Sequence, residues 1–287
     1  MSIVRRGGGY LGAAGLLCAA VSASAACGAV SEAQPAAPAA TSARSAGAVA
    51  NGRELGLFPG EAMTFEVSLA GIVGGEGAFA VGELEQLDGK KQLAVRSRLA
   101  TVGAAALLKK VVDDATTWVD VETGLPTNLT SDVTMGGDRF VAQCRFDGGK
   151  VAVDFWRNQQ PEPTRTGFDF GPDDAHTAHS IMAALRSWRP APGTTRTVYV
   201  VGGRRIWRSD LVFVGKESIP TRLGTRAAAR LDGVAMRSRP DRSIDDKAKR
   251  REFSVWLSDD ADMVPLRVKS TTELGDVLIE LTDYQRP

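Results

Sequence analysis

Apolar and polar residues alternate along most of this chain in short segments. In MTFEVSL, residues 63–69, every second residue is apolar, and the alternation resumes after a glycine-rich stretch. A period of two places apolar side chains on one face of a β-strand, whereas a helix needs a period near 3.6. Segments of the same kind are residues 117–121, 133–135, 140–146, 151–156, 197–201, 207–214, 253–257, 266–268 and 277–281.

Glycine and aspartate separate these segments, in stretches such as GGD, DGG, VGGRR, SDDAD and ELGD. These residues favour tight turns because glycine tolerates positive φ and aspartate bonds to nearby backbone. Short strands joined in this way, mostly without helical periods between them, predict an all-β domain. We expect it to be mainly antiparallel, as a curved sheet or an open barrel, with one or two short helices.

Two segments have helical character. Residues 99–112, LATVGAAALLKKVV, are rich in Ala and Leu and predict one short helix. Residues 173–188, DDAHTAHSIMAALRSW, predict a second helix, with Asp173 or Asp174 as its cap. Its apolar positions recur at helical spacing at Ile181, Leu185 and Trp188.

The N-terminus has the organisation of an export signal. Two arginines precede a short apolar segment, and small residues follow, which predicts a signal peptide over residues 1–26. Cys27 then stands where a bacterial lipoprotein carries its lipidated cysteine, although Ser24 occupies the usual leucine position. Two outcomes stay open: a lipoprotein anchored to the membrane through Cys27, and a soluble periplasmic protein released by simple cleavage.

Residues 27–54 are rich in Ala, Pro and Ser and predict a flexible linker, because they offer no large apolar side chain to bury. Residues 55–287 then form the folded domain. The formal net charge of the chain is only +1, so its bulk charge suggests no polyanionic partner. Within the domain Cys144 is the single cysteine, which leaves no partner for a disulfide there.

The glycine run GIVGGEG, residues 71–77, could cradle a phosphate or turn the chain. A phosphate loop leads from a strand through glycines into a helix that begins with lysine, and here the chain passes directly into another strand. We therefore assign a structural role, in a tight or bulged connection, to Gly71, Gly74, Gly75 and Gly77. No cofactor is expected.

Candidate chemical groups are few. His176 and His179 are the only histidines, and with Asp173 and Asp174 they could hold a metal such as zinc, or they could form a solvated first helical turn. No third ligand signature completes a metal site, so we expect no metal. Asp113 belongs to an acidic cluster and could act as an acid or base, although a role at a strand end is simpler.

Arginines flank Trp207 in GGRRIWR, a combination that could stack nucleic-acid bases. An exported chain of nearly neutral charge argues against nucleic acid as a partner. Contact with anionic glycans or lipids of the envelope fits such a surface better.

Several stretches, in order, resemble the bacterial domain of unknown function DUF3108. They are PGEAMTFEVSLAGIVGGEGAFAV, VVDDATTWVDVETGLPTNL, ALRSWRP, VGKESIPTRLGT and FSVWLSDDADMVPLRVKSTTELGDVLIELTDY. The resemblance extends from Phe58 to Tyr284 and implies a mostly antiparallel β fold in an exported envelope protein, without an established activity. The chain departs from the family at HTAH, residues 176–179, where Asp and Ser are more usual.

These observations favour a non-enzymatic protein in the periplasm, or in the outer membrane as a lipoprotein. Its β domain would bind an apolar or glycan ligand, or another envelope component, on a concave apolar surface. One alternative is an envelope hydrolase that uses Asp113, His176 or His179. The other is a structural scaffold without a ligand.

Overall fold

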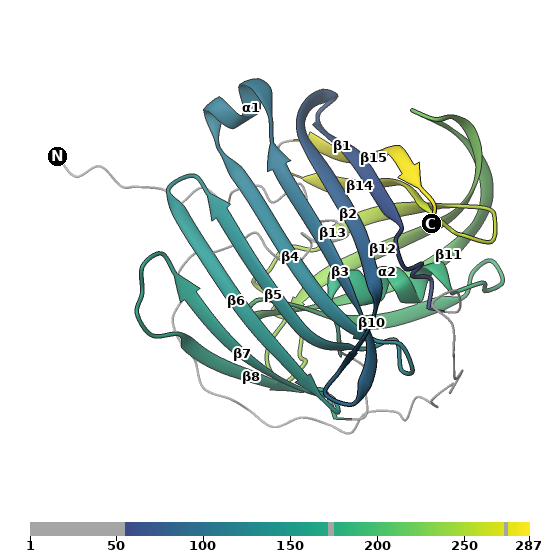
Figure 1. Ribbon diagram of the computed structural model, residues 1–287. Coiled ribbons are helices and arrows are strands. Elements are labelled where there is room, and N and C mark those ends of the chain that lie inside the picture. The colour runs from purple at the N-terminus through teal and green to yellow at the C-terminus, as the bar shows by residue number, and fades with distance from the viewer. Residues whose placement is uncertain (1–54, 172–174, 273–274) are drawn as a thin grey trace.

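The alternating segment at residues 63–69 lies at the centre of the sheet. In the computed structural model, which describes residues 55–171, 175–272 and 275–287, this segment is β1 (Ala62–Leu69). It pairs with β2 (Ile72–Leu87) on one side and with β15 (Gly275–Gln285) on the other. The first and last strands are therefore neighbours, and the sheet grows outward from this pair in both directions (Figure 1).

All strands of the described residues belong to one 15-stranded sheet. Beyond β2 come β3 (Lys90–Thr101), β4 (Val111–Asp120), β5 (Pro126–Met135), β6 (Asp138–Asp147), β7 (Lys150–Arg157) and β8 (Thr164–Asp169). Beyond β15 come β14 (Pro265–Thr272), β13 (Arg251–Ser258), β12 (Gly224–Ser238), β11 (Arg205–Thr221), β10 (Thr195–Gly202) and β9 (Ala175–His176). Within the described ranges, only the short pairing of β9 with β10 is parallel. The predicted all-β, mainly antiparallel fold is confirmed.

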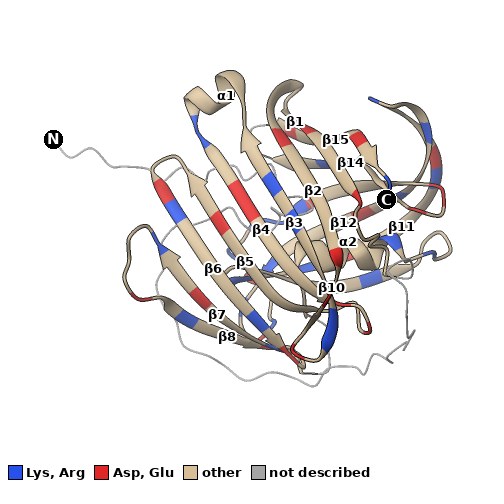
Figure 2. Ribbon diagram, in the orientation of Figure 1, with Lys and Arg blue, Asp and Glu red and all other residues tan. Residues whose placement is uncertain are grey.

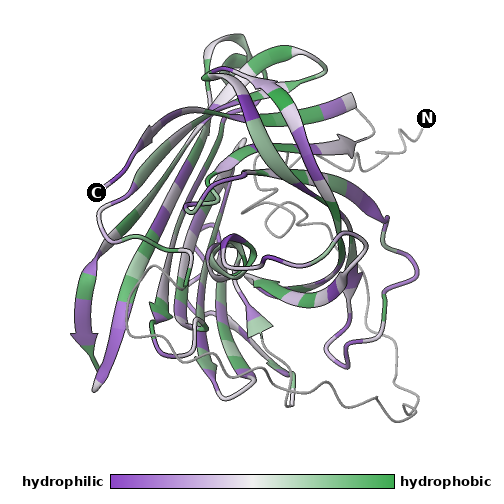
Figure 3. Ribbon diagram, turned by 90° about the vertical axis from the view of Figure 1, so that its right-hand side faces the viewer, coloured by the Kyte–Doolittle hydropathy of each residue, from purple (hydrophilic) through white to green (hydrophobic). Residues whose placement is uncertain are grey.

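The sheet curves until its two ends pack face to face. Val151 and Val153 of β7 belong to the same buried cluster as Val201 of β10 and Ile206 of β11, although β7 pairs with neither of these strands. A long sheet twists and curls because each strand is twisted. Apolar contact between the two ends of the sheet removes their inner faces from water. The result is the curled sheet seen in Figure 3.

Helix α2 (Ala178–Arg186) lies inside this curve (Figures 1 and 3). Ile181, Met182 and Leu185 bury its apolar face in the cluster formed by β1 and β10–β15. The helix begins after Thr177, whose side chain accepts a hydrogen bond from the Ser180 N–H in a capping box. Residues 173 and 174, predicted to cap it, lie outside the described residues. No helix of the described ranges is long and apolar enough to cross a membrane.

The helix expected over residues 99–112 is much shorter than predicted. Only α1 (Gly103–Leu108) is helical, and the flanking residues belong to β3 and β4. Helical propensity was a poor guide here because the flanking residues pair with each other, Ala100 with Val112 and Leu99 with Asp113.

The turn between β1 and β2 consists of Ala70 and Gly71, with φ of 50° and 82°. The remaining glycines of this stretch lie within β2, and neither Gly74 nor Gly75 has positive φ. Gly74 is the extra residue of a bulge, since Val67 pairs with Gly75 while the next residue, Ser68, pairs with Val73.

Candidate functional site

A buried ion pair fixes helix α2 to the centre of the sheet. The Arg186 guanidinium donates from Nη1 to Glu61 Oε1 at 2.6 Å and from Nη2 to Oε2 at 3.0 Å, and both side chains are 0% exposed. Arg186 Nε also donates to the Asp262 carbonyl, and the guanidinium lies 5.0 Å from the Phe58 ring centroid. Arg186 stands in the last turn of α2, where a cation interacts favourably with the helix dipole.

The first turn of α2 places His179 against the inner face of β3 and β4. Its Nε2 lies 2.8 Å from Ser97 Oγ of β3, and its Nδ1 lies 2.8 Å from Thr117 Oγ1 of β4. The ring of Phe79 packs edge-on against the imidazole. Burial lowers the pKa of His179 to about 4, so the ring is neutral at pH 7. The alternative of a solvated first turn is wrong for this residue.

The neighbouring hydroxyls indicate which His179 nitrogen carries the proton. Thr117 donates its hydroxyl proton to Thr177 Oγ1 at 3.1 Å. Thr117 therefore accepts from His179, which places the imidazole proton on Nδ1. Nε2 is left as an acceptor for the Ser97 hydroxyl. Each group therefore donates to the next: Ser97 to His179, His179 to Thr117, and Thr117 to Thr177.

His176 occupies a separate buried position. It belongs to the short strand β9 rather than to the helix, and its Nδ1 lies 3.2 Å from Ser180 Oγ. Burial, and secondarily the positive charge of Arg196, lower the pKa of His176 to about 3. The solvated first turn is wrong for His176 as well. Ser180 and Thr177 connect His176 to Thr117, the hydroxyl partner of His179.

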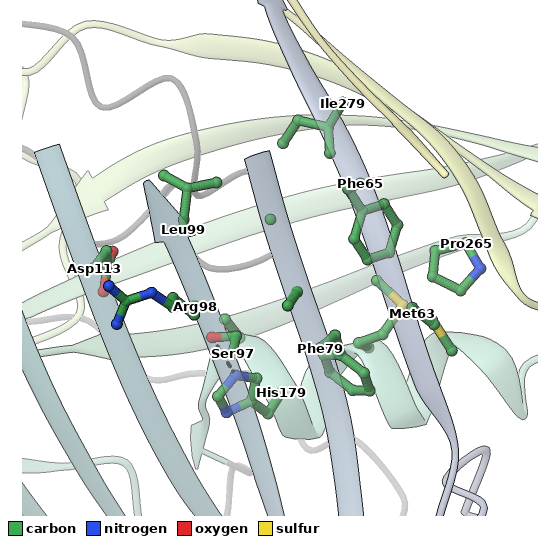
Figure 4. A pocket seen from close by; sticks show the side chains of 14 residues that line it. Met63, Phe65, Phe79, Ser97, Arg98, Leu99, Asp113, His179, Pro265 and Ile279 are labelled. Carbon is green, nitrogen blue, oxygen red and sulfur yellow. Dashed lines mark hydrogen bonds between the residues drawn. The ribbon is translucent and has the colours of Figure 1, made fainter. Parts of the chain in front are cut away.

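A pocket of about 60 Å³ lies between the first half of α2 and the inner face of the sheet (Figure 4). Its walls are apolar, formed by Met63, Phe65, Phe79, Leu99, Met182, Pro265 and Ile279. Polar residues lie together at one side, namely Ser97, Arg98, Asp113 and His179, and the Arg98 guanidinium is paired with Asp114. Such an arrangement, an apolar cleft with a few grouped polar side chains, is typical of a small-molecule site.

A smaller cavity of about 30 Å³ lies along the same polar groups. It shares Asp113, Ala178 and His179 with the larger pocket and adds Thr117 and Thr177 among its lining residues. His179 and its hydroxyl partners therefore separate two small spaces.

The structure brings Asp113 and His179 to one pocket, and Gly77 lines the same pocket. His176 lines neither space. Cys144, the single cysteine of the domain, is buried elsewhere, and burial raises the pKa of its thiol to about 12. Within the described ranges, no group of three or more His, Cys, Asp or Glu side chains could hold a metal ion. Cys27 and the predicted signal peptide and linker lie outside the described residues.

Trp207 is not the exposed stacking surface that its sequence context allowed. Its side chain is buried in the apolar cluster around α2, and the Arg251 guanidinium lies 5.0 Å from the centroid of its ring. A base could not stack on this ring without displacing the core.

Sequence reasoning missed Ser97, Thr117 and Met182 as site residues. A signal for Ser97 exists, because LAVRSRL, residues 93–99, alternates and places Ser97 on the apolar face with Leu93 and Val95. A lone hydroxyl on a buried face needs a partner, which here is the histidine. Nothing local indicated which histidine would supply it.

Comparison with known proteins gives a family and a fold. The family model "Protein of unknown function (DUF3108)" matches residues 64–282. No curated protein matches the sequence at a significant level.

Among solved structures, a β-barrel-like protein of the domain of unknown function DUF1849 from Brucella abortus is similar. It shares 11% identity at a TM-score of 0.52, over 80% of this chain and 98% of that one. The hypothetical lipoprotein YmcC of Escherichia coli shares 7% identity at a TM-score of 0.29, over 82% of this chain and 89% of that one. The first likeness supports the fold alone, and the second carries no argument.

Proposed function

The chain belongs to the DUF3108 family, whose function is unknown, and from this premise we propose that it is an exported cell-envelope protein that binds an apolar group. The ligand would occupy the pocket between α2 and strands β1–β4. The observation that carries the proposal is the pocket itself, with apolar walls on most sides and Ser97, Asp113 and His179 at one side. An apolar chain with a polar end matches this distribution.

The size of the pocket favours part of a ligand over a whole one. About 60 Å³ is well below the several hundred Å³ of a typical ligand pocket, so it would take only the polar end of an acyl chain and the carbons next to it. Met63 and Met182 form part of the wall, and methionine side chains adapt to irregular shapes because they rotate freely. A glycan is less suitable, since it would need many more polar partners than these walls offer.

A substitution at Gly77 tests this proposal. A Cβ added at Gly77 would meet Leu99 Cδ1 and Phe65 Cβ at ordinary contact distances of 3.6 Å, and the backbone has no positive φ. Gly77→Val should therefore reduce the pocket, because its Cβ meets only ordinary contacts. We expect the variant to lose binding of a fluorescent fatty acid, displaceable by palmitate, that the unchanged protein retains.

Gly137→Val is the matched control, because a Cβ at Gly137 has open space and Gly137 lies in the β5–β6 turn. Equal binding by the three proteins would remove the pocket as the ligand site. Absence of binding to all of them, with native lipid absent by mass spectrometry, would favour the scaffold alternative.

The 2.8 Å contact between Ser97 and His179 supports a second candidate, an envelope hydrolase. A serine that donates to a neutral imidazole is the first pair of a nucleophilic site. Incubation with a fluorophosphonate probe tests it. Labelling at Ser97 that is lost in His179→Gln would favour hydrolysis, and an unlabelled Ser97 would argue against it.

The envelope location rests on the export signal predicted over residues 1–26 and on Cys27. If Cys27 is lipidated, Cys27→Ser should move the protein from the detergent-soluble membrane fraction to the soluble periplasm. A soluble distribution for both forms would leave simple signal cleavage.

A further inference from the structure

Four large apolar side chains are exposed at one end of the sheet. Ile72 and Val73 begin β2 and are 74% and 47% exposed, while Leu107 and Leu108 end α1 and are 89% and 90% exposed. Among the described residues, only Leu84 and Val214 are other large apolar residues of comparable exposure. We call Ile72, Val73, Leu107 and Leu108 the apolar tip.

The two elements of the tip are packed together. The Val102 N–H, just before α1, donates to the Gly74 carbonyl of β2 at 2.9 Å. A Cβ at Gly74 would lie 2.9 Å from Ala105 Cβ, so the bulge glycine lets the helix approach the strand closely. Figure 1 shows α1 and the β1–β2 turn at the same end of the sheet.

Helix α1 forms an ordered protrusion in the connection between β3 and β4. Thr101 Oγ1 donates to the Lys109 carbonyl at 3.1 Å and accepts from the Val111 N–H at 2.9 Å, which closes the base of the excursion. Yet none of the residues of α1, GAAALL, is buried. An apolar helix that is held in place while its two leucines stay exposed is typical of an interaction surface.

Positive charge borders the tip. Lys109 and Lys110 follow α1 directly, and Figure 2 shows basic residues at the foot of an otherwise uncharged α1. On the neighbouring strands, Asp276 of β15 is paired with Lys269 at 2.7 Å, and Glu76 stands further along β2, opposite Glu66. The charges that follow Leu107 and Leu108 in the chain are therefore positive, whereas the charge nearest to Ile72 and Val73 along β2 is Glu76.

We propose that the apolar tip docks on a phospholipid membrane surface. Leucine and isoleucine side chains would insert at the boundary of the acyl chains, while Lys109 and Lys110 would contact anionic headgroups. Two adjacent lysines beside four exposed apolar residues fit an anionic bilayer better than a protein groove, which would need more apolar area. The inference is independent of the pocket ligand.

Vesicle binding tests the proposal. The protein is produced with its export signal and Cys27→Ser, purified from the periplasm, and weighed by mass spectrometry to verify removal of the signal. We expect it to float with phosphatidylethanolamine–phosphatidylglycerol vesicles. Leu107→Ser/Leu108→Ser should weaken binding by about tenfold or more, because two exposed apolar side chains no longer insert.

Leu84→Ser and Val214→Ser are the matched controls, because they remove exposed apolar side chains away from the tip, and both should bind like the unchanged protein. Ile72→Thr tests the second element of the tip and should also weaken binding. Lys109→Gln/Lys110→Gln should remove the preference for phosphatidylglycerol over phosphatidylcholine.

A fluorescent label gives a readout that does not depend on affinity. Cys144 is buried and will not react in the folded protein, so Leu108→Cys and Leu84→Cys can be labelled selectively with an environment-sensitive dye. Vesicles should shift the emission to the blue for the label at position 108 only.

Equal binding by tip and control variants, or no blue shift at position 108, would overturn the proposal. A chain that dimerises in solution, becomes monomeric with Leu107→Ser/Leu108→Ser and ignores vesicles would also overturn it, and would assign the tip to a second copy.

Discussion

Removing the charge of Glu61 should destabilise the protein far more than removing an exposed carboxylate. Glu61→Gln keeps the shape of the side chain but leaves the Arg186 guanidinium, 0% exposed, without its charged partner. Removal of one partner from a buried ion pair costs about 3–5 kcal/mol because the other charge stays buried. Arg186 retains the Asp262 carbonyl and the Phe58 ring, so we expect the lower half of this range.

Urea unfolding followed by tryptophan fluorescence measures the change in the free energy of unfolding. Asp114→Asn is the matched control, because Asp114 pairs with Arg98 at 2.8 Å while these two side chains are 44% and 59% exposed. An exposed pair contributes about 0–1 kcal/mol. The difference between the two variants isolates the effect of burial.

The double variant Glu61→Gln/Arg186→Met completes the test. Since it removes both charges, its cost should be smaller than the sum of the two single costs. A loss below about 1 kcal/mol for Glu61→Gln would refute the reasoning, because it would mean that water reaches Arg186. Helix α2 would then be held mainly by its apolar face and by the contacts of His179 with Ser97 and Thr117.

Three further predictions follow from the interior. Burial lowers the pKa of His179 to about 4, below the 6.5 of a free imidazole, so the unfolded state binds more protons between these pH values. The free energy of unfolding should be fully retained above pH 6.5 and decrease by about 3 kcal/mol toward pH 4. In urea unfolding curves recorded over this pH range, His179→Gln should remove that decrease. Gly75→Val should cost about 1–3 kcal/mol, because its Cβ would lie 3.1 Å from the Ala100 carbonyl oxygen, and unchanged thermal unfolding would contradict that cost. Burial raises the pKa of Cys144 to about 12, so iodoacetamide should modify this thiol only in denaturant, as intact-mass measurement can verify.

The strands that could be predicted are those in which one apolar face alternates with a polar one. Residues 151–156 and 277–281 both lie in strands, because burial of one face selects a period of two whatever the neighbouring strand is. The curvature that brings β7 against β10 could not be predicted, since it depends on contacts between segments with no sequence relation.

Strand β12 was not predicted because its sequence, GTRAAARLDGVAMRS, has low strand propensity. The small residues have a tertiary cause. A Cβ at Gly233 would lie 2.4 Å from the Phe253 ring on β13, and Ala235 is 0% exposed. Close packing against large neighbours requires small residues at these positions, and the composition of the strand alone does not reveal those neighbours.

The site was predictable in part. Asp113 and His179 were candidates from their chemistry, and they line one pocket. The predicted surroundings of His179 were wrong, because an exposed first helical turn was considered for a histidine that faces the interior of the sheet. The contact of His179 with Thr117 joins residues 62 positions apart, and only the folded sheet brings them together.

The protonation of His179 distinguishes a binding site from a hydrolytic one. A general base works best with a pKa near the working pH, and the partner of Nδ1 in serine hydrolases is a carboxylate that stabilises the charged ring. Here Nδ1 donates to the Thr117 hydroxyl, which supplies no charge, and burial lowers the pKa to about 4. Removing the Ser97 proton would therefore create a poorly stabilised imidazolium. The neutral pair of Ser97 and His179 is well suited to donate a hydrogen bond to the polar end of a ligand, or to accept one from it. We expect Ser97→Ala to weaken fatty-acid binding several-fold in the displacement assay. If Ser97→Ala instead left binding unchanged and abolished ester hydrolysis, the pair would be catalytic.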